Sequence, residues 1–292
     1  MAGNFQRFKS TLVYQANAGA DELLTDLDKI REFDKRSESR LRRYQIITLV
    51  AILIALGGFV GKVITEQHGL LLLGLAGVAS AIGGGLLWFR GRRFDLANRR
   101  YELCGELVRL VNRDMAKGVP INVRLDLAPP HDRRKLTTEG TAGAWKVKYF
   151  VDPWLSLEGR FADGTTFNIA MVEKFQQRGK WKRGRSGKNK YKSKTKTCTL
   201  AEASIYPKLK RYENLPQVVA QAGNLLKLPG WADVKKMEAT AEVLSVTTTT
   251  SADWSVRRLK PSNPYDAVEL VATMLLSLYQ VLHVSKAGRR RA

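Results

Sequence analysis

The feature that most constrains this chain is a pair of long apolar stretches separated by a short connection. The first, Tyr44 to Gly61, contains eighteen residues without a charge, and the second, Gly69 to Phe89, contains twenty-one. A helix needs about 20 such residues to cross the hydrocarbon core of a bilayer, and Lys62 can extend its amine to the interface after the first stretch. We therefore predict a membrane protein with a transmembrane helical hairpin, its helices at residues 44–64 and 69–89. A buried hairpin in a soluble protein is the alternative.

Basic residues flank this hairpin on one side only. Residues 31–43 contain six Lys and Arg and residues 90–100 contain five, whereas the connection contains only Lys62. Because cytoplasmic flanks of membrane helices carry such an excess, we predict a multi-pass protein of the bacterial inner membrane with both termini in the cytoplasm. Neither apolar stretch contains an ionisable residue, which argues against an ion or proton relay through a monomer.

Small residues recur at four-residue spacing in both predicted membrane helices. Such residues let helices approach closely. They serve either contacts within one hairpin or contacts between hairpins of a homo-oligomer, and both interpretations stay open. The candidate packing residues are Gly57, Gly61, Gly77, Ala81 and Gly85.

Heptad patterns on both sides of the hairpin predict further helices. Residues 21–43 follow an apolar seam, and a second seam continues from the membrane through residues 90–117. We expect these helices to pair as a cytoplasmic stalk, either within one chain or between subunits. Residues 1–20 are expected to form an N-terminal tail.

This layout resembles the SLATT-type two-transmembrane effector regions of bacterial conflict systems. The segments that carry the resemblance are LRRYQIITLVAILIALGGFVG, LLLLGLAGVASAIGGGLLWF and RRYELCGELVRLVNRD, within residues 20–117. The resemblance implies an oligomeric, membrane-perturbing effector that works beside a sensor of nucleotide signals. It extends to no part of the remaining chain.

From residue 118 onward the pattern changes to that of a basic cytoplasmic α+β domain. Apolar residues alternate with polar ones over residues 119–127 and 145–151, and Asp163-Gly164 is a favourable hairpin turn. We predict a mostly antiparallel sheet with helices on one face, including helices at 214–227 and 265–285. The second of these is apolar nearly all round, so a third membrane span is an alternative to packing across the sheet. Further strands are expected over residues 234–249 and 254–260.

One strand of this domain has a lysine at every second position between Lys188 and Lys196. Residues 174–196 contain eleven Lys and Arg and no acid, and the whole chain carries a net charge of +22. This excess predicts a polyanionic partner: nucleic acid, a nucleotide or anionic lipid headgroups. Lysines that protect a sheet edge from aggregation are the alternative. The candidate anion-binding residues are Lys180, Lys182, Arg183, Arg185, Lys188, Lys190, Lys192, Lys194 and Lys196, with Trp181 and Tyr191 as candidate stacking residues.

No catalytic pattern accompanies these features. The segment Gly179 to Ser186 superficially resembles a phosphate-binding loop, but a strand follows it where such a loop leads into a helix. His131 and Asp132 lie side by side without a nucleophile near them in sequence. We therefore predict no enzyme activity, cofactor or metal. The expected function is a membrane-anchored, cytoplasm-facing polyanion-binding module, with an oligomeric membrane effector or pore of a defence system, gated by the cytoplasmic domain, as the alternative.

Overall fold

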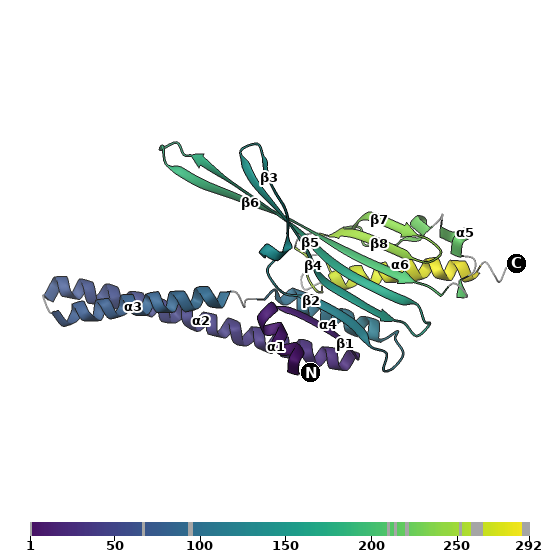
Figure 1. Ribbon diagram of the computed structural model, residues 1–292, viewed down its shortest axis with the longest axis horizontal. Coiled ribbons are helices and arrows are strands. Elements are labelled where there is room, and N and C mark those ends of the chain that lie inside the picture. Colours follow the sequence, from purple (N-terminus) through teal and green to yellow (C-terminus); the bar gives the residue numbers. More distant parts are fainter. Residues whose placement is uncertain are drawn as a thin grey trace. The chain divides into compact units, whose positions relative to one another are not determined.

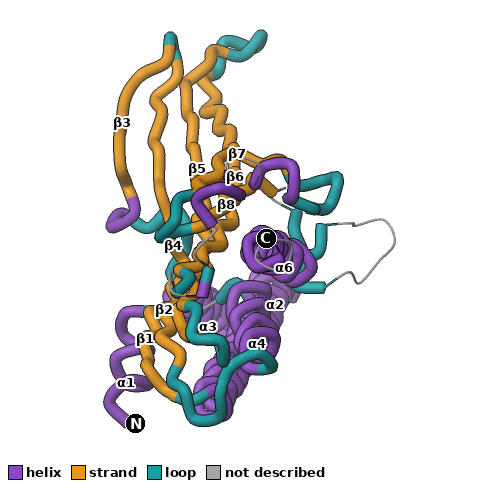
Figure 2. The backbone as a smooth tube through the Cα atoms, turned by 90° about the vertical axis from the view of Figure 1, so that its right-hand side faces the viewer, coloured by secondary structure: helices purple, strands orange, loops and turns teal. Residues whose placement is uncertain are grey.

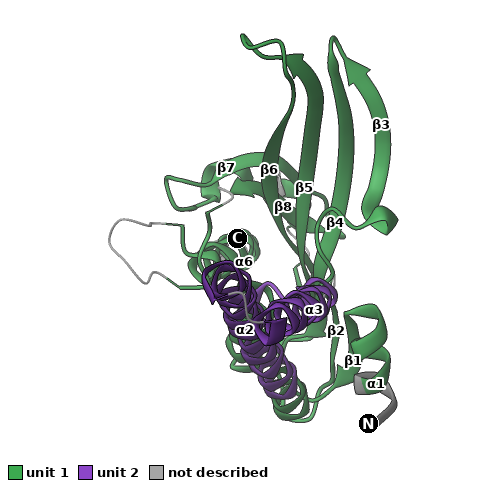
Figure 3. Ribbon diagram, turned by 90° about the vertical axis from the view of Figure 1, so that its left-hand side faces the viewer, with its two compact units in different colours: residues 1–27, 99–292 green, residues 28–98 purple. Residues whose placement is uncertain are grey.

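The chain forms two compact units. Residues 28–98 form one unit, and residues 1–27 with 99–292 form the other (Figure 3). The unit that contains the sheet therefore includes residues assigned above to a tail and to a stalk. The computed structural model describes residues 2–65, 68–92, 96–208, 211–212, 215–219, 222–250, 253–257 and 265–287.

The unit 28–98 contains two long helices, α3 (His68–Gly91) and most of α2 (Ala20–Thr65), whose residues 20–27 belong to the other unit. The predicted helix at 21–43 and the first apolar stretch thus form one continuous helix. Large apolar side chains such as Leu49, Leu72 and Leu86 are mostly exposed on the two helices, as expected of a surface that faces lipid. Both helices are long and apolar enough to cross a membrane.

Small residues bring α2 and α3 together within the hairpin. A side-chain carbon on Gly77 would lie 2.6 Å from the Ala55 nitrogen, and one on Gly58 would lie 2.5 Å from the Gly74 nitrogen. Of the predicted packing residues, Gly61 and Gly77 serve this contact, whereas Gly57 and Gly85 have open space beside them. Gly58, Gly74 and Gly84 also make it, and the four-residue spacing rule did not select them.

The other unit, residues 1–27 with 99–292, is built on an eight-stranded sheet whose described pairings between strands are all antiparallel. The strand order is β1-β2-β4-β5-β6-β8-β7, and β3 pairs with β4. Figures 1 and 2 show how the strands extend across the unit. The strands are β1 (Val13–Ala18), β2 (Ile121–Asp126), β3 (Leu136–Ala142), β4 (Trp145–Arg160), β5 (Thr166–Arg183), β6 (Asn189–Tyr206), β7 (Asp233–Ala239) and β8 (Leu244–Thr250).

Helices cover one face of this sheet, as predicted. The helix α4 (Asn98–Asn112) buries Leu103, Leu107 and Val108, and α6 (Ala267–Ala287) packs on β6 and β8. Strand alternation supplies the opposing apolar side chains, with Ile121, Val123 and Leu125 of β2 buried between exposed neighbours. The remaining elements are α1 (Ala2–Thr11), η2 (Arg133–Lys135), α5 (Leu215–Val219) and η4 (Ala222–Leu225).

The helix α6 is a third helix long and apolar enough to cross a membrane among the residues that the structure describes. It differs from α2 and α3 because half of its apolar window is buried within the protein, compared with 17% for each of the others. Leu270, Met274 and Leu278 are fully buried. The structure therefore places residues 267–287 on the sheet, in agreement with the preferred of the two predictions.

Several sequence predictions were wrong in detail. Residues 1–20 are not a tail, because they contain α1 and β1, and β1 pairs with β2 along its whole length. The predicted stalk over 90–117 is interrupted after Gly91, and α4 belongs to the sheet unit because its apolar seam packs there. Among the described residues of the helix expected at 214–227, the structure has the short α5 and η4, and residues 214 and 220–221 lie outside the described residues. The segment 234–249, predicted as one strand, contains parts of two strands, β7 and β8. Another strand was expected over residues 254–260, of which residues 258–260 lie outside the described residues.

Candidate polyanion-binding face

The strands β5 and β6 form a long hairpin that extends beyond the helix-covered part of the sheet (Figures 1 and 2). They pair continuously from Thr166–Tyr206 to Arg183–Asn189. The strand β8 pairs only with residues 199–205 of β6, so within the described chain the lysine-rich half of β6 is an edge strand. On the other side, β4 and β3 accompany β5 as far as Gly179.

The register of this hairpin places cations directly opposite one another. Lys182 pairs with Lys190, Lys180 with Lys192, and Arg178 with Lys194. Directly paired residues of antiparallel strands point to the same face of the sheet. Two rows of positive charge therefore run side by side, one on each strand.

These residues belong to a larger surface that we call the cationic face. Seven of its eight side chains are exposed and Lys180 is half-buried, with its amine 4.4 Å from the ring centre of Trp145. No Asp or Glu occurs between residues 174 and 198. The cationic face consists of Lys174, Arg178, Lys180, Lys182, Lys190, Lys192, Lys194 and Lys196.

The predicted stacking residues lie on the opposite face of the hairpin. Trp181 and Tyr191 pair with each other, meet edge to face at 5.2 Å, and are 72% and 59% exposed. The Tyr191 ring covers Gly179, where a side chain would collide with its hydroxyl. Because side chains alternate along a strand, these aromatic rings point away from the cationic face. At the tip of the hairpin, however, Tyr191 lines one small hollow together with Lys182 and Lys190.

The turn of the hairpin holds the remaining predicted residues. Lys188 precedes β6, so only four of the five alternating lysines lie within the strand. The Lys188 carbonyl accepts a hydrogen bond from the Gly184 amide at 2.8 Å. Arg183 lies on the aromatic side and donates from Nε to the Gly187 carbonyl at 3.3 Å. Arg185 is exposed in the turn. Sequence reasoning missed Lys174 and Arg178, although their even numbering along β5 matches that of Lys180 and Lys182.

Edge protection accounts for only part of this arrangement. Lysines on an edge strand prevent two sheets from pairing, which explains the charges of β6. It does not explain Lys174 and Arg178 of β5, because β5 lies between β4 and β6 as far as Gly179. Two unit charges about 5 Å apart in water repel by about 0.8 kcal/mol before salt screening, so three opposed pairs oppose folding by roughly 2 kcal/mol. An anion held between the rows would remove this repulsion.

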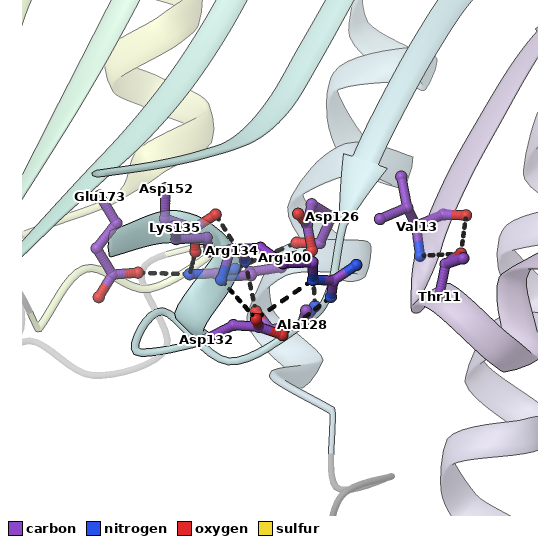
Figure 4. A network of polar contacts seen from close by, with 10 residues as sticks. All are labelled: Thr11, Val13, Arg100, Asp126, Ala128, Asp132, Arg134, Lys135, Asp152 and Glu173. Carbon is purple, nitrogen blue, oxygen red and sulfur yellow. Dashed lines mark hydrogen bonds and ion pairs between the residues drawn. The ribbon is translucent and has the colours of Figure 1, made fainter. Parts of the chain in front are cut away.

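A buried ionic cluster connects α4 to the strands β4 and β5 (Figure 4). The Arg100 guanidinium of α4 donates to the Asp152 carboxylate of β4 at 2.8 Å and to the Glu173 carboxylate of β5 at 2.7 Å. It also donates to the Asp126 carbonyl at 3.1 Å and lies 5.1 Å from the ring centre of Trp154. Arg100 is 2% exposed and Asp152 is fully buried.

A second buried cation completes the cluster. The Lys135 amine lies 2.8 Å from the Asp152 carboxylate and 3.2 Å from the Asp126 carboxylate, and it donates to the Ala128 carbonyl. Burial raises the pKa of Asp152 above its ordinary value, although Arg100 and Lys135 both oppose this shift. Glu173 directly precedes Lys174 of the cationic face, so the cluster fixes the base of that face. Its members are distant in sequence, and no local pattern identifies them.

The residues considered for catalysis have other contacts. The Asp132 carboxylate accepts from the backbone and side chain of Arg134, and the His131 ring lies 6.2 Å from that of Phe175. Cys104 and Cys198 are both free, and burial raises the pKa of the Cys104 thiol to about 12. Across the described ranges, no three His, Cys, Asp or Glu side chains are grouped so that they could hold a metal ion.

Comparison of the chain with protein-family models, with curated proteins and with solved structures finds no match.

Proposed function

We propose that this protein is a membrane-anchored module that binds a polyanion through its cationic face. The observation that carries the proposal is the direct opposition of three cation pairs on two strands, in a segment that has no Asp or Glu between residues 174 and 198. In the proposed arrangement α2 and α3 cross the bacterial inner membrane, both termini are cytoplasmic, and the sheet unit binds its ligand from the cytoplasm. The basic residues at both ends of the hairpin support this orientation.

The phosphate backbone of a nucleic acid is the ligand that this face fits best. Cations arranged in regular rows neutralise successive phosphates without reading base sequence. A surface that docks on a bilayer usually combines cations with exposed apolar anchors on the same side, and here Trp181 and Tyr191 lie on the other side. We therefore expect binding that depends little on sequence and steeply on salt.

The test measures binding of labelled duplex and single-stranded RNA to the full chain in detergent, over a range of salt concentrations. The variant Arg178→Gln/Lys180→Gln/Lys192→Gln/Lys194→Gln removes two of the opposed pairs. If each cation contacts one phosphate, the slope of log K against log salt falls by about 3 to 4. Competition with vesicles of anionic lipid separates nucleic acid from a lipid surface as the ligand.

A control variant removes the same charge elsewhere on the sheet unit. Arg113, Lys117, Arg124 and Arg160 are all exposed and lie outside the cationic face, so changing them to Gln lowers the net charge equally. We expect the control to retain the salt slope of the wild type. Equal loss in both variants would show that only net charge matters, and vesicles that displace all RNA would assign the face to lipid.

An oligomeric membrane effector is the second candidate function. It is favoured by Gly57, Gly83 and Gly85, which have open space beside them on the outside of the hairpin and could admit a neighbouring helix. Native mass spectrometry of the detergent-solubilised chain, with and without RNA, tests it. A discrete oligomer that becomes monomeric in Gly57→Leu/Gly85→Leu supports this function, and a monomer under every condition refutes it.

A further inference from the structure

A hollow lies between α2 and α3 near the basic end of the hairpin, entirely within the unit 28–98. It has a volume of about 540 Å³ and receives one arginine from each helix. Gly91 approaches Leu41 closely, because a side-chain carbon on Gly91 would lie 2.6 Å from the Leu41 methyl group. The residues that line the hollow are Ser37, Arg40, Leu41 and Tyr44 of α2 with Leu87, Phe89, Arg90 and Gly91 of α3.

The lining combines three kinds of group that suit a phospholipid. Arg40 and Arg90 supply positive charge, Ser37 and Tyr44 supply hydroxyl donors, and Leu87 and Phe89 supply apolar surface. Leu87 is half exposed and Phe89 is 72% exposed, so both remain accessible to acyl chains. A purely apolar ligand would form no hydrogen bonds with the arginines and hydroxyls that line the hollow.

Two arginines near the hollow have other partners. Arg36 pairs with Glu32 one helical turn away at 2.5 Å, and Arg92 lies 4.9 Å from the ring centre of Trp88. Arg40 donates through Nε to the Arg36 carbonyl at 3.3 Å. Within the described part of the chain this is its one hydrogen bond, so its terminal nitrogens are available for a phosphate.

The position of the hollow agrees with this chemistry. Tyr44 begins the first uncharged stretch and Phe89 ends the second, so the hollow lies at the level where hydrocarbon gives way to headgroups. Tyrosine and arginine are typical residues of this level. Basic pockets between membrane helices on the cytoplasmic side bind anionic headgroups.

We propose that this hollow binds one anionic phospholipid. Arg40 and Arg90 hold the phosphate from opposite sides, Ser37 and Tyr44 donate hydrogen bonds to it, and the acyl chains lie along Leu87 and Phe89. A zwitterionic lipid binds less well because its choline cation is repelled by the same arginines. The inference rests on the proposed crossing of the bilayer by α2 and α3, but it is independent of the cationic face.

Native mass spectrometry of the full chain in mild detergent tests the site. Phosphatidylglycerol and phosphatidylcholine with identical acyl chains are titrated separately. We expect one phosphatidylglycerol to be retained in preference to phosphatidylcholine, and Arg40→Gln/Arg90→Gln to weaken that retention by about 10-fold or more, since each basic residue near anionic lipid contributes appreciably.

The matched control is Arg42→Gln/Arg43→Gln, which removes the same charge from adjacent exposed positions that do not line the hollow. It should change retention by less than about 2-fold. Equal retention of the two lipids, or equal loss in the two double variants, would overturn the site. Flotation of the chain with vesicles tests bilayer insertion separately, so an inserted chain without lipid preference refutes the site alone.

Discussion

At the scale of single residues, Arg100 connects α4 to β4 and β5 through the buried carboxylates of Asp152 and Glu173. Its replacement by Met keeps much of the side-chain volume but leaves both carboxylates without this cation. Loss of one partner from a buried ion pair costs about 3–5 kcal/mol. We expect Arg100→Met to lower the free energy of unfolding by this amount, as measured by urea denaturation with tryptophan fluorescence as the signal.

A control for this prediction lies on the same helix. Arg109 pairs with Glu106 at 2.8 Å, but its side chain is largely exposed, so Arg109→Met should cost no more than about 1 kcal/mol. The double variant Arg100→Met/Glu173→Gln should recover part of the lost stability, because it removes a buried carboxylate together with its cation and leaves Asp152 paired with Lys135. Similar losses for the two single variants would contradict the assigned role of the cluster.

At the scale of elements, the turn between β4 and β5 is fixed by the carboxylate of Asp163. This group accepts hydrogen bonds from the Thr165 amide and hydroxyl and from the Tyr212 hydroxyl. Burial by itself raises the pKa of Asp163, but these hydrogen bonds outweigh burial and hold the pKa below its ordinary value. The ionised form therefore stabilises the fold.

The pH dependence of stability follows from this shift. Because the folded pKa of Asp163 is below the unfolded value of about 3.9, its contribution is complete well above pH 4 and is lost as the pH falls through the folded pKa. We expect Asp163→Asn to be less stable by about 1 kcal/mol at pH 7. Its melting temperature should also fall less steeply than that of the wild type between about pH 5 and pH 3. Parallel pH profiles would refute this role.

The hairpin of α2 and α3 permits a matched test of helix packing. A side chain at Gly77 would meet the backbone of Ala55, whereas one at Gly85 would meet nothing within 4 Å. Gly77→Leu should destabilise the hairpin by about 1–3 kcal/mol through overpacking, and Gly85→Leu should leave it unchanged or slightly stabilised. Thermal unfolding of the two variants in detergent makes the comparison, and equal melting temperatures would exclude the close contact at Gly77.

At the scale of the whole molecule, two different forces could hold the chain at a membrane. Insertion through the apolar surfaces of α2 and α3, as proposed, would not be reversed by salt, whereas attraction through the net charge of +22 would be screened by it. In 1 M salt the Debye length is about 3 Å. We expect the wild type and the cationic-face variant to remain equally in the membrane pellet under these conditions. Release of the chain into the supernatant would contradict insertion.

The sequence by itself determined the features that depend on local periodicity. The uncharged stretches formed long helices, the alternation in residues 119–127 formed β2, and Asp163-Gly164 formed a hairpin turn with Gly164 at φ +87°. Each pattern lies within one element, so burial of one helix stripe or one strand face is enough to select it. The alternating lysines were also predicted as one face of a strand, and four of them are.

Only the tertiary structure decided which surfaces come together. The pairing of Arg178 with Lys194 depends on the register of β5 and β6, and Arg100 meets Glu173 from a distance of 73 residues in the chain. Residues 13–18 became an edge strand because β2 offered unpaired backbone groups more than 100 residues later. Such contacts are selected by the packing of the whole core and by backbone hydrogen bonding between distant segments, which local composition does not encode.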